Sequence, residues 1–131
     1  MIDKKLNLLI ADDEIYVRII VKAYFAPYDL EIFEAKDGKE AMQILKSEEI
    51  DLLILDYLMP SVNGQEVINR MQLDEKLSKI PVILYSAGGY EEEIENWLKM
   101  SSMAYVEKTN IGEELLPTVK DILGSRLKSK N

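Results

Sequence analysis

Polar side chains follow four of the apolar runs in this sequence, close to the point where each run ends. They are Asp12 and Asp13, Asp56, Ser86 and Lys108. Three carboxylates brought into one crevice repel one another unless protons or a cation compensate their charge. Mg²⁺ prefers oxygen ligands and is typically held by one or two carboxylates together with phosphate oxygens. We therefore predict a Mg²⁺ site with Asp13 and Asp56 as ligands and Asp12 acting through water.

Asp56 is the carboxylate that this arrangement places for attack on phosphorus. A carboxylate can act as a nucleophile and form an acyl phosphate, as in aspartyl-phosphate ATPases. The transferred group carries negative charge, which positioned cations and hydrogen-bond donors must stabilise. The Lys108 ammonium and the Ser86 hydroxyl suit this task, and the small side chain of Ala87 leaves room beside Ser86. The residue types thus predict phosphoryl transfer to Asp56.

The elements that would position these residues alternate between strands and helices. Apolar, β-branched-rich runs predict strands at Leu6–Ala11, Leu30–Ala35, Leu52–Leu55, Val82–Tyr85 and Ala104–Val106. Apolar residues at helical spacing follow each run. After the first run they are Val17, Ile20, Val21 and Tyr24. Because each parallel connection needs a crossover long enough for a helix, we predict an α/β fold with helices on both faces of a five-stranded parallel sheet. In such folds the functional crevice lies beyond the carboxyl ends of the strands.

Composition narrows the classes of function. The 131 residues fit one domain, expected over residues 1–123. Cysteine and histidine are absent from the sequence, which excludes disulfides, thiol nucleophiles, Cys/His zinc sites and imidazole chemistry. The formal net charge of -8 argues against direct binding to nucleic acid or to an anionic membrane. No apolar run nears the roughly 20 residues of a membrane span, and the start has no signal-peptide block, so a cytoplasmic protein is expected.

The end of the chain carries two further expectations. If Asn110 caps the last helix and Glu113 completes a capping box, Pro117 falls beyond the first turn, so we expect a kink or a later helix start. Residues 124–131 carry three positive charges and no negative charge. This pattern predicts a solvated basic tail, with a linker stub from a longer protein as the alternative.

Each candidate taken singly has a simpler interpretation. An acidic residue after a strand is often only a helix cap, a serine there is often a turn residue, and a lone lysine is usually a solvated charge. Tyr105, on the short last run, would ordinarily be a core residue. The joint occurrence of the polar residues at successive strand ends is what indicates a site.

The acidic pair, the segment Asp56-Tyr57-Leu58-Met59-Pro60 with Gly64 four residues on, Ser86-Ala87 and Lys108 form one pattern. This pattern, from about Leu6 to Leu123, resembles the receiver domains of bacterial two-component response regulators. The resemblance implies a flavodoxin-like fold with strand order 2-1-3-4-5, which places the first and third strand ends side by side.

The resemblance also implies roles for individual residues. Asp56 would accept a phosphoryl group from a sensor histidine kinase or phosphotransfer protein. Asp12 and Asp13 would hold Mg²⁺ together with the backbone carbonyl of Leu58, and Lys108 would contact the phosphate.

A further implication is a conformational switch. Ser86 would move toward the phosphoryl group and the rotamer of Tyr105 would follow it. The local change of charge would bias a surface formed by the fourth helix, the fifth strand and the fifth helix, where a downstream protein partner binds. The chain would therefore be a signalling switch and not an enzyme of turnover.

The sequence departs from the family pattern in two places. Proline usually follows the lysine, often through a cis bond, whereas Thr109 follows Lys108 here. A non-proline cis bond costs about 2.5–4 kcal/mol, so we expect a trans bond and a reshaped loop. The segment Tyr90–Glu95 is unusually acidic for a docking surface, which favours a basic partner, although a solvated face is the simpler interpretation.

Several alternatives stay open to different degrees. A phosphohydrolase of the haloacid-dehalogenase kind needs an acid two residues after the nucleophile, where this chain has Leu58. A flavodoxin-like cofactor site is disfavoured because Asp12-Asp13-Glu14 would repel a phosphate. A phosphorylation-independent interaction module remains an alternative. So does a receiver that belongs to a larger DNA-binding regulator.

Overall fold

The computed structural model of the chain describes residues 5–59, 62–87, 92 and 103–130. Within these ranges no helix is both long and apolar enough to span a bilayer.

Five parallel strands form one sheet in the order β2-β1-β3-β4-β5. The strands are β1 (Leu6–Ala11), β2 (Leu30–Ala35), β3 (Leu52–Asp56), β4 (Val82–Ser86) and β5 (Ala104–Glu107). The predicted α/β fold and strand order are confirmed. Ala11 lies in register with Leu55, so the next residues along β1 and β3, Asp12 and Asp56, come to the same edge of the sheet.

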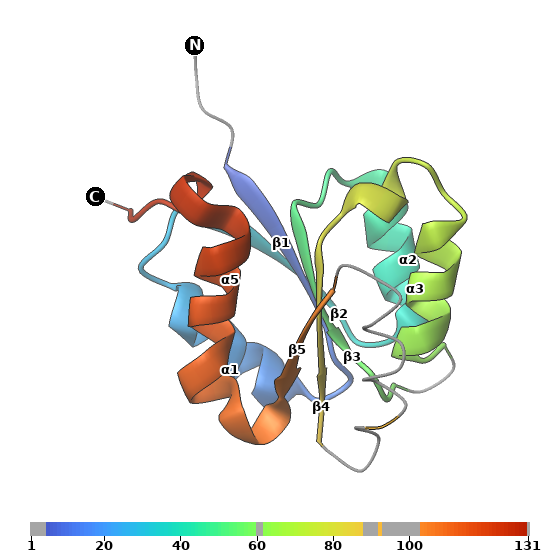
Figure 1. The fold of residues 1–131 in the computed structure, drawn as a ribbon, viewed down its shortest axis with the longest axis horizontal. Coiled ribbons are helices and arrows are strands. Elements are labelled where there is room, and N and C mark those ends of the chain that lie inside the picture. Colours follow the sequence, from blue (N-terminus) through green and yellow to red (C-terminus); the bar gives the residue numbers. More distant parts are fainter. Residues whose placement is uncertain (1–4, 60–61, 88–91, 93–102, 131) are drawn as a thin grey trace.

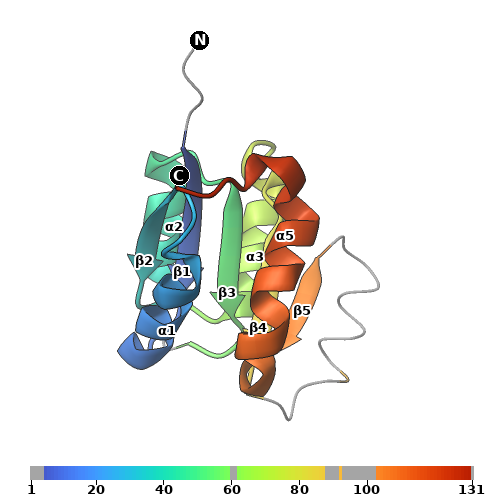
Figure 2. The ribbon, with the colours of Figure 1, turned by 90° about the vertical axis from the view of Figure 1, so that its left-hand side faces the viewer.

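Helices cover both faces of this sheet. α1 (Ile15–Phe25) and α5 (Leu116–Leu123) lie on one face, and α2 (Gly38–Ser47) and α3 (Gly64–Gln72) lie on the other (Figures 1 and 2). β3 shows the consequence, because Leu52 and Ile54 pack into the core on the side of α1 and α5, while Leu53 and Leu55 pack toward α2 and α3. A parallel sheet buried on both faces needs uninterrupted apolar runs, which is why its strands are visible in the sequence.

The predicted helix α1 is present, but its buried stripe is narrower than its set of apolar residues. Val21 and Phe25 are buried and Val17 is partly buried, whereas Ile20 and Tyr24 have 48% and 36% of their surface exposed. The helix therefore faces the sheet with a narrow i, i+4, i+8 stripe. The apolar residues that indicated this helix, Ile20 and Tyr24 among them, therefore lie on more than one side of it.

The approach to α5 confirms the expected late start of the last helix. A 3₁₀ turn over Lys108–Asn110 and a π-helical turn over Ile111–Leu115 precede α5. Pro117 consequently lies in the first turn of α5, where its missing N–H removes no helical hydrogen bond. Asn110 makes no side-chain capping bond, so the capping box considered for it does not form.

The basic C-terminal segment differs from the expected solvated tail. Its charged side chains are exposed, but its backbone pairs with the loop between α1 and β2. The Asp29 N–H donates to the Lys128 carbonyl at 2.7 Å, and the Lys130 N–H donates to the Pro27 carbonyl at 2.9 Å. Leu127 packs against the core on the side of α1 and α5. These are long-range pairings that the local charge pattern does not reveal.

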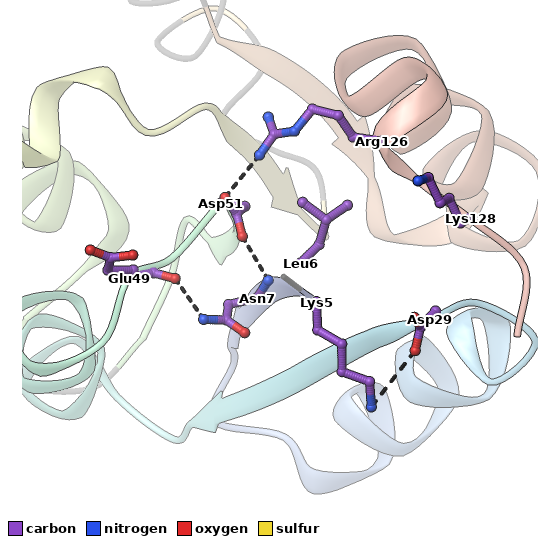
Figure 3. A pocket seen from close by; sticks show the side chains of 8 residues that line it. All are labelled: Lys5, Leu6, Asn7, Asp29, Glu49, Asp51, Arg126 and Lys128. Carbon is purple, nitrogen blue, oxygen red and sulfur yellow. Dashed lines mark hydrogen bonds and ion pairs between the residues drawn. The ribbon is translucent and has the colours of Figure 1, made fainter. Parts of the chain in front are cut away.

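Arg126 anchors the same segment at the amino-terminal end of the sheet, where charged residues line a hollow (Figure 3). Its guanidinium donates to Asp51 at 2.9 Å, and the other oxygen of Asp51 accepts the Asn7 N–H at 2.8 Å. Lys5 pairs with Asp29 at 3.7 Å. Because these charges pair with one another, we assign no ligand to the hollow.

Truncation after Leu123 tests whether this segment belongs to the fold. We expect urea unfolding to show a loss of about 1–3 kcal/mol, because the backbone bonds to the α1–β2 loop and the packing of Leu127 disappear. Arg126→Ala alone should cost less than about 1 kcal/mol, since its ion pair is half exposed. A truncated protein as stable as the full chain would show that the segment contributes nothing.

Gly64, the first residue of α3, lies directly against the end of β3. Its N–H donates to the Tyr57 carbonyl at 2.9 Å. A Cβ at this position would lie 2.6 Å from the Asp56 carbonyl oxygen and 2.9 Å from the Tyr57 Cα. Both neighbours are backbone atoms, so only glycine allows α3 to approach β3 this closely.

Gly64→Ala should therefore destabilise the fold by about 1–3 kcal/mol, as overpacking does elsewhere. Gln65→Ala, at the next and exposed position of α3, is the matched control and should change stability by less than about 0.5 kcal/mol. Thermal unfolding of the two variants checks this. Equal melting temperatures would contradict the steric role of Gly64.

Candidate functional site

Three carboxylates meet at the carboxyl ends of β1 and β3. Asp12, Asp13 and Asp56 each offer one oxygen, and these oxygens lie within 4.8 Å of one another. Asp12 is fully buried and Asp56 is 2% exposed, whereas Asp13 is exposed. The set contains only hard oxygen donors and opens to solvent at Asp13, so its chemistry fits Mg²⁺, which keeps several waters.

Lys108, the residue after β5, reaches across the sheet edge into this cluster. Its ammonium lies 3.0 Å from Asp56 Oδ2 and 3.2 Å from Asp12 Oδ2. The Lys108–Thr109 peptide bond is trans, as expected, and the side chain still reaches both carboxylates. Burial alone would lower the pKa of Lys108, but the charges and hydrogen bonds of Asp56 and Asp12 raise it above its ordinary value. The lysine is therefore a fixed positive charge.

The Asp56 carboxylate has an unusual electrostatic environment. Burial and the nearby charge of Asp12 raise the pKa of Asp56 to about 7, although Lys108 and the Leu58 N–H, which donates at 3.2 Å, act in the opposite direction. Burial of the carboxylate and repulsion from Asp12 together therefore exceed what a single lysine compensates. A divalent cation would supply the missing positive charge.

Three other predicted site residues, Ser86, Tyr105 and Leu58, lie on or directly after the strands that end near Asp56. Ser86 is buried at the end of β4, directly after Tyr85, whose register partner on β3 is Asp56. Tyr105 pairs in register with Leu84 and packs, half-buried, against the core on the side of α2 and α3, the face to which Ser86 also belongs. Leu58 follows Asp56 by two residues and has 45% of its surface exposed.

Sequence reasoning missed Tyr85, which contacts two members of the cluster. The Tyr85 hydroxyl donates to Asp12 Oδ2 at 2.5 Å, and the Lys108 ammonium lies 5.2 Å from the centre of the Tyr85 ring. Burial and the charge of Asp12 hold the pKa of Tyr85 far above its usual range, so the phenol remains a donor. The available signal was a tyrosine inside an apolar strand, because a buried tyrosine hydroxyl usually needs a partner.

Arg18 on α1 is a second residue that sequence reasoning missed. Its guanidinium donates to the Asp12 carbonyl at 2.5 Å and to Glu34 at 3.1 Å. Burial pushes the pKa of Glu34 upward, but hydrogen bonds from Lys22 and Arg18 lower it below its usual value. This network holds the backbone of the acidic pair against β2. No local pattern in the sequence indicates it.

Two other features bear on the prediction of a site. The hollow of Figure 3 lies at the opposite end of the strands, away from the three carboxylates. The acidic segment 90–95, expected on the docking face, lies outside the described residues except for residue 92.

Comparison with known proteins adds independent evidence. The family model described as "Response regulator receiver domain" matches residues 8–120. A chemotaxis protein CheY homolog of Campylobacter jejuni is 30% identical over 122 residues, which cover 92% of this chain and 94% of that protein. The probable transcriptional regulator ycf27 of Cyanophora paradoxa is 32% identical over 122 residues, or 93% of this chain and 49% of that protein.

A solved structure of a response regulator is also similar to this chain. The response regulator TrrA of Thermotoga maritima, in complex with Mg²⁺-BeF, has 29% sequence identity and a TM-score of 0.75, with 90% of this chain and 99% of that chain covered. The chain spans about half the length of the transcriptional regulators that it matches. Since the family model covers most of the sequence and the sheet has the order of such domains, the chain belongs to the response regulator receiver domain family.

Proposed function

We propose that this chain is a phosphorylation-activated switch in which Asp56 accepts a phosphoryl group in the presence of Mg²⁺. The observation that carries the proposal is the buried Asp56 carboxylate in contact with Lys108, beside the oxygens of Asp12 and Asp13. Receiver domains are signalling switches and not enzymes of turnover, and they receive phosphate from histidine kinases, which supports this assignment.

Mg²⁺ would be held by Asp13, Asp56 and the backbone carbonyl of Leu58, with Asp12 acting through water. When bound, the ion supplies positive charge that draws a phosphoryl donor to the site and offsets charge in the transition state. The TrrA structure with Mg²⁺-BeF supports this choice of cation.

Asp56 is the nucleophile of the proposed reaction. One of its carboxylate oxygens forms a bond to phosphorus as the bond from phosphorus to the donor breaks, and the donor leaves with that electron pair. Lys108 already lies 3.0 Å from Asp56 and needs little movement to meet an oxygen of the acyl phosphate. The Ser86 hydroxyl donates to another phosphoryl oxygen, and Tyr105, on the same sheet face, changes rotamer with it.

The surface around the site supports the proposed protein partners. Ile15 and Tyr16 are 56% and 75% exposed and lie just beyond the acidic pair, where a histidine kinase or phosphotransfer protein would find apolar contacts. A downstream protein partner would bind the face that includes β5 and α5. In a longer protein, the same change could control a DNA-binding output, as the names of the longer relatives suggest.

Intact-mass measurement after incubation with Mg²⁺ and acetyl phosphate tests the acceptor. We expect one added phosphoryl group on the wild type and none on Asp56→Ala or in EDTA. Asp121→Asn, which changes an exposed carboxylate on α5, is the matched control and should still be labelled. Undiminished labelling of Asp56→Ala would move the acceptor elsewhere. No labelling of the wild type by either acetyl phosphate or a histidine kinase would favour a phosphorylation-independent module.

The raised pKa of Asp56 predicts a pH-dependent effect of Asp56→Asn in metal-free protein. Because the folded state binds this proton more tightly than the unfolded state, the stabilisation from Asp56 is fully present below about pH 4 and is lost as pH rises toward 7. Asp56→Asn removes the buried charge. At pH 8 in EDTA its free energy of unfolding should therefore exceed that of the wild type by an amount on the order of 1–3 kcal/mol.

Urea unfolding at pH 5 and pH 8 checks this expectation. The advantage of Asp56→Asn should shrink at pH 5, where the wild-type carboxyl group carries its proton. An Asp56→Asn protein that is less stable than wild type at pH 8 would mean that Lys108 fully compensates the two carboxylates.

A further inference from the structure

Tyr85 lies behind the acceptor site and contacts it from the core. The residue is 1% exposed, and its ring packs among apolar residues on the side of α1 and α5. Its hydroxyl nevertheless lies 2.5 Å from Asp12 Oδ2, a carboxylate 73 positions away in the sequence. The register of β4 with β3 places Tyr85 beside Asp56 as well. The side chain of this core residue therefore reaches the charged groups of the site.

The hydrogen bonds of Asp12 show what the hydroxyl does. Asp12 Oδ1 accepts the Glu14 N–H at 2.8 Å, while Oδ2 accepts Tyr85 and pairs with Lys108 at 3.2 Å. A carboxylate has about four lone-pair positions, two on each oxygen. Among the described residues, Tyr85 and Lys108 thus occupy Oδ2, and Oδ1 retains a free position. This fixes which oxygen of Asp12 is available to a water molecule on a cation.

The Tyr85 ring makes a separate contribution through Lys108. The ammonium lies 5.2 Å from the ring centre, and the Lys108 side chain is only 15% exposed, so the group is largely withdrawn from water. A desolvated ammonium over an aromatic face is attracted to the ring by about 2 kcal/mol or less. The ring therefore helps to keep the ammonium between Asp12 and Asp56.

We propose that Tyr85 is a positioning residue of the phosphoryl-acceptor site, whose hydroxyl orients the Asp12 carboxylate for Mg²⁺ and whose ring supports the Lys108 ammonium. Tyr85 contacts no reacting atom and acts through these two side chains. The inference rests on the proposed function of Asp56 and adds a residue from the core of β4 to that site. Partners that orient metal-binding groups are typically worth about 10–100-fold in metal affinity or activity.

Tyr85→Phe isolates the hydroxyl because it keeps the ring and fills the same space in the core. Calorimetric titration with Mg²⁺ alone, without a phosphoryl donor, should show affinity about tenfold weaker than wild type. In acetyl phosphate assays the Mg²⁺ concentration for half-maximal rate should rise by more than the maximal rate falls. Unchanged or tighter Mg²⁺ binding by a folded Tyr85→Phe protein would overturn the role of the hydroxyl.

Tyr85→Leu removes both the hydroxyl and the ring. It should bind Mg²⁺ as weakly as Tyr85→Phe and, in addition, show a lower maximal rate at saturating Mg²⁺, because Lys108 loses its support. Both variants lack the hydroxyl, so if one of them fails to fold, the other still tests the role of the hydroxyl. A maximal rate equal to that of Tyr85→Phe would overturn the role of the ring.

Tyr28→Phe is the matched control. The Lys120 ammonium lies 5.8 Å from the centre of the Tyr28 ring, but Tyr28 precedes β2, at the end of the sheet opposite the carboxylates. This substitution should leave Mg²⁺ affinity unchanged. In an Asp12→Asn background, Tyr85→Phe should have no further effect on Mg²⁺ affinity. A full effect in that background would mean that the hydroxyl acts on the fold and not through Asp12, which would refute the proposal.

The outcomes separate this inference from the proposed function. A wild type that binds Mg²⁺ but accepts no phosphoryl group contradicts the proposed function, while the calorimetric comparison still decides the role of the Tyr85 hydroxyl. A wild type that is phosphorylated, with Tyr85→Phe identical to it in Mg²⁺ affinity and rate, contradicts the inference alone.

Discussion

Repulsion between two buried carboxylates, Asp12 and Asp56, is the interaction on which the arrangement of this site depends. Lys108 lies within 3.2 Å of both and compensates part of their charge. One ammonium is not enough, because burial and Asp12 still raise the pKa of Asp56 to about 7. The site therefore has an excess of negative charge at the edge of the sheet. Such a site favours the binding of a divalent cation.

The fold makes this unfavourable arrangement possible by fixing its members to rigid elements. Parallel strands in register bring Asp12 and Asp56 to one edge, and Gly64 lets α3 approach the end of β3 closely. Arg18 holds the Asp12 carbonyl from α1. The free energy of burying these charges is offset by a sheet that is apolar on both faces.

The same arrangement suits a switch. Lys108 contacts the Asp56 carboxylate directly, so a change of charge on Asp56 must change the contacts of Lys108, the residue that follows β5. Ser86 and Tyr105 belong to the same face of the neighbouring strands. A change at the carboxylate can therefore reach the outer strand through side chains that are already packed together.

The sequence by itself determined the strands, their order through the family resemblance, and the residues at the strand ends. It did so because a parallel sheet covered on both faces requires continuous apolar runs, and polar residues that end such runs must meet at one edge. The buried side of α1 was only partly predictable, since apolar residues such as Ile20 occur outside its buried stripe.

Only the tertiary structure decided which atoms meet. Three contacts depend on how separate elements pack. They are the hydrogen bond from Tyr85 to Asp12, the hydrogen bond from Arg18 to the Asp12 carbonyl, and the backbone pairing of the C-terminal segment with the α1–β2 loop. Local periodicity records which face of an element is apolar. It does not record which side chain from a distant strand fills the space beside a given carboxylate, because that is settled by the packing of the whole domain.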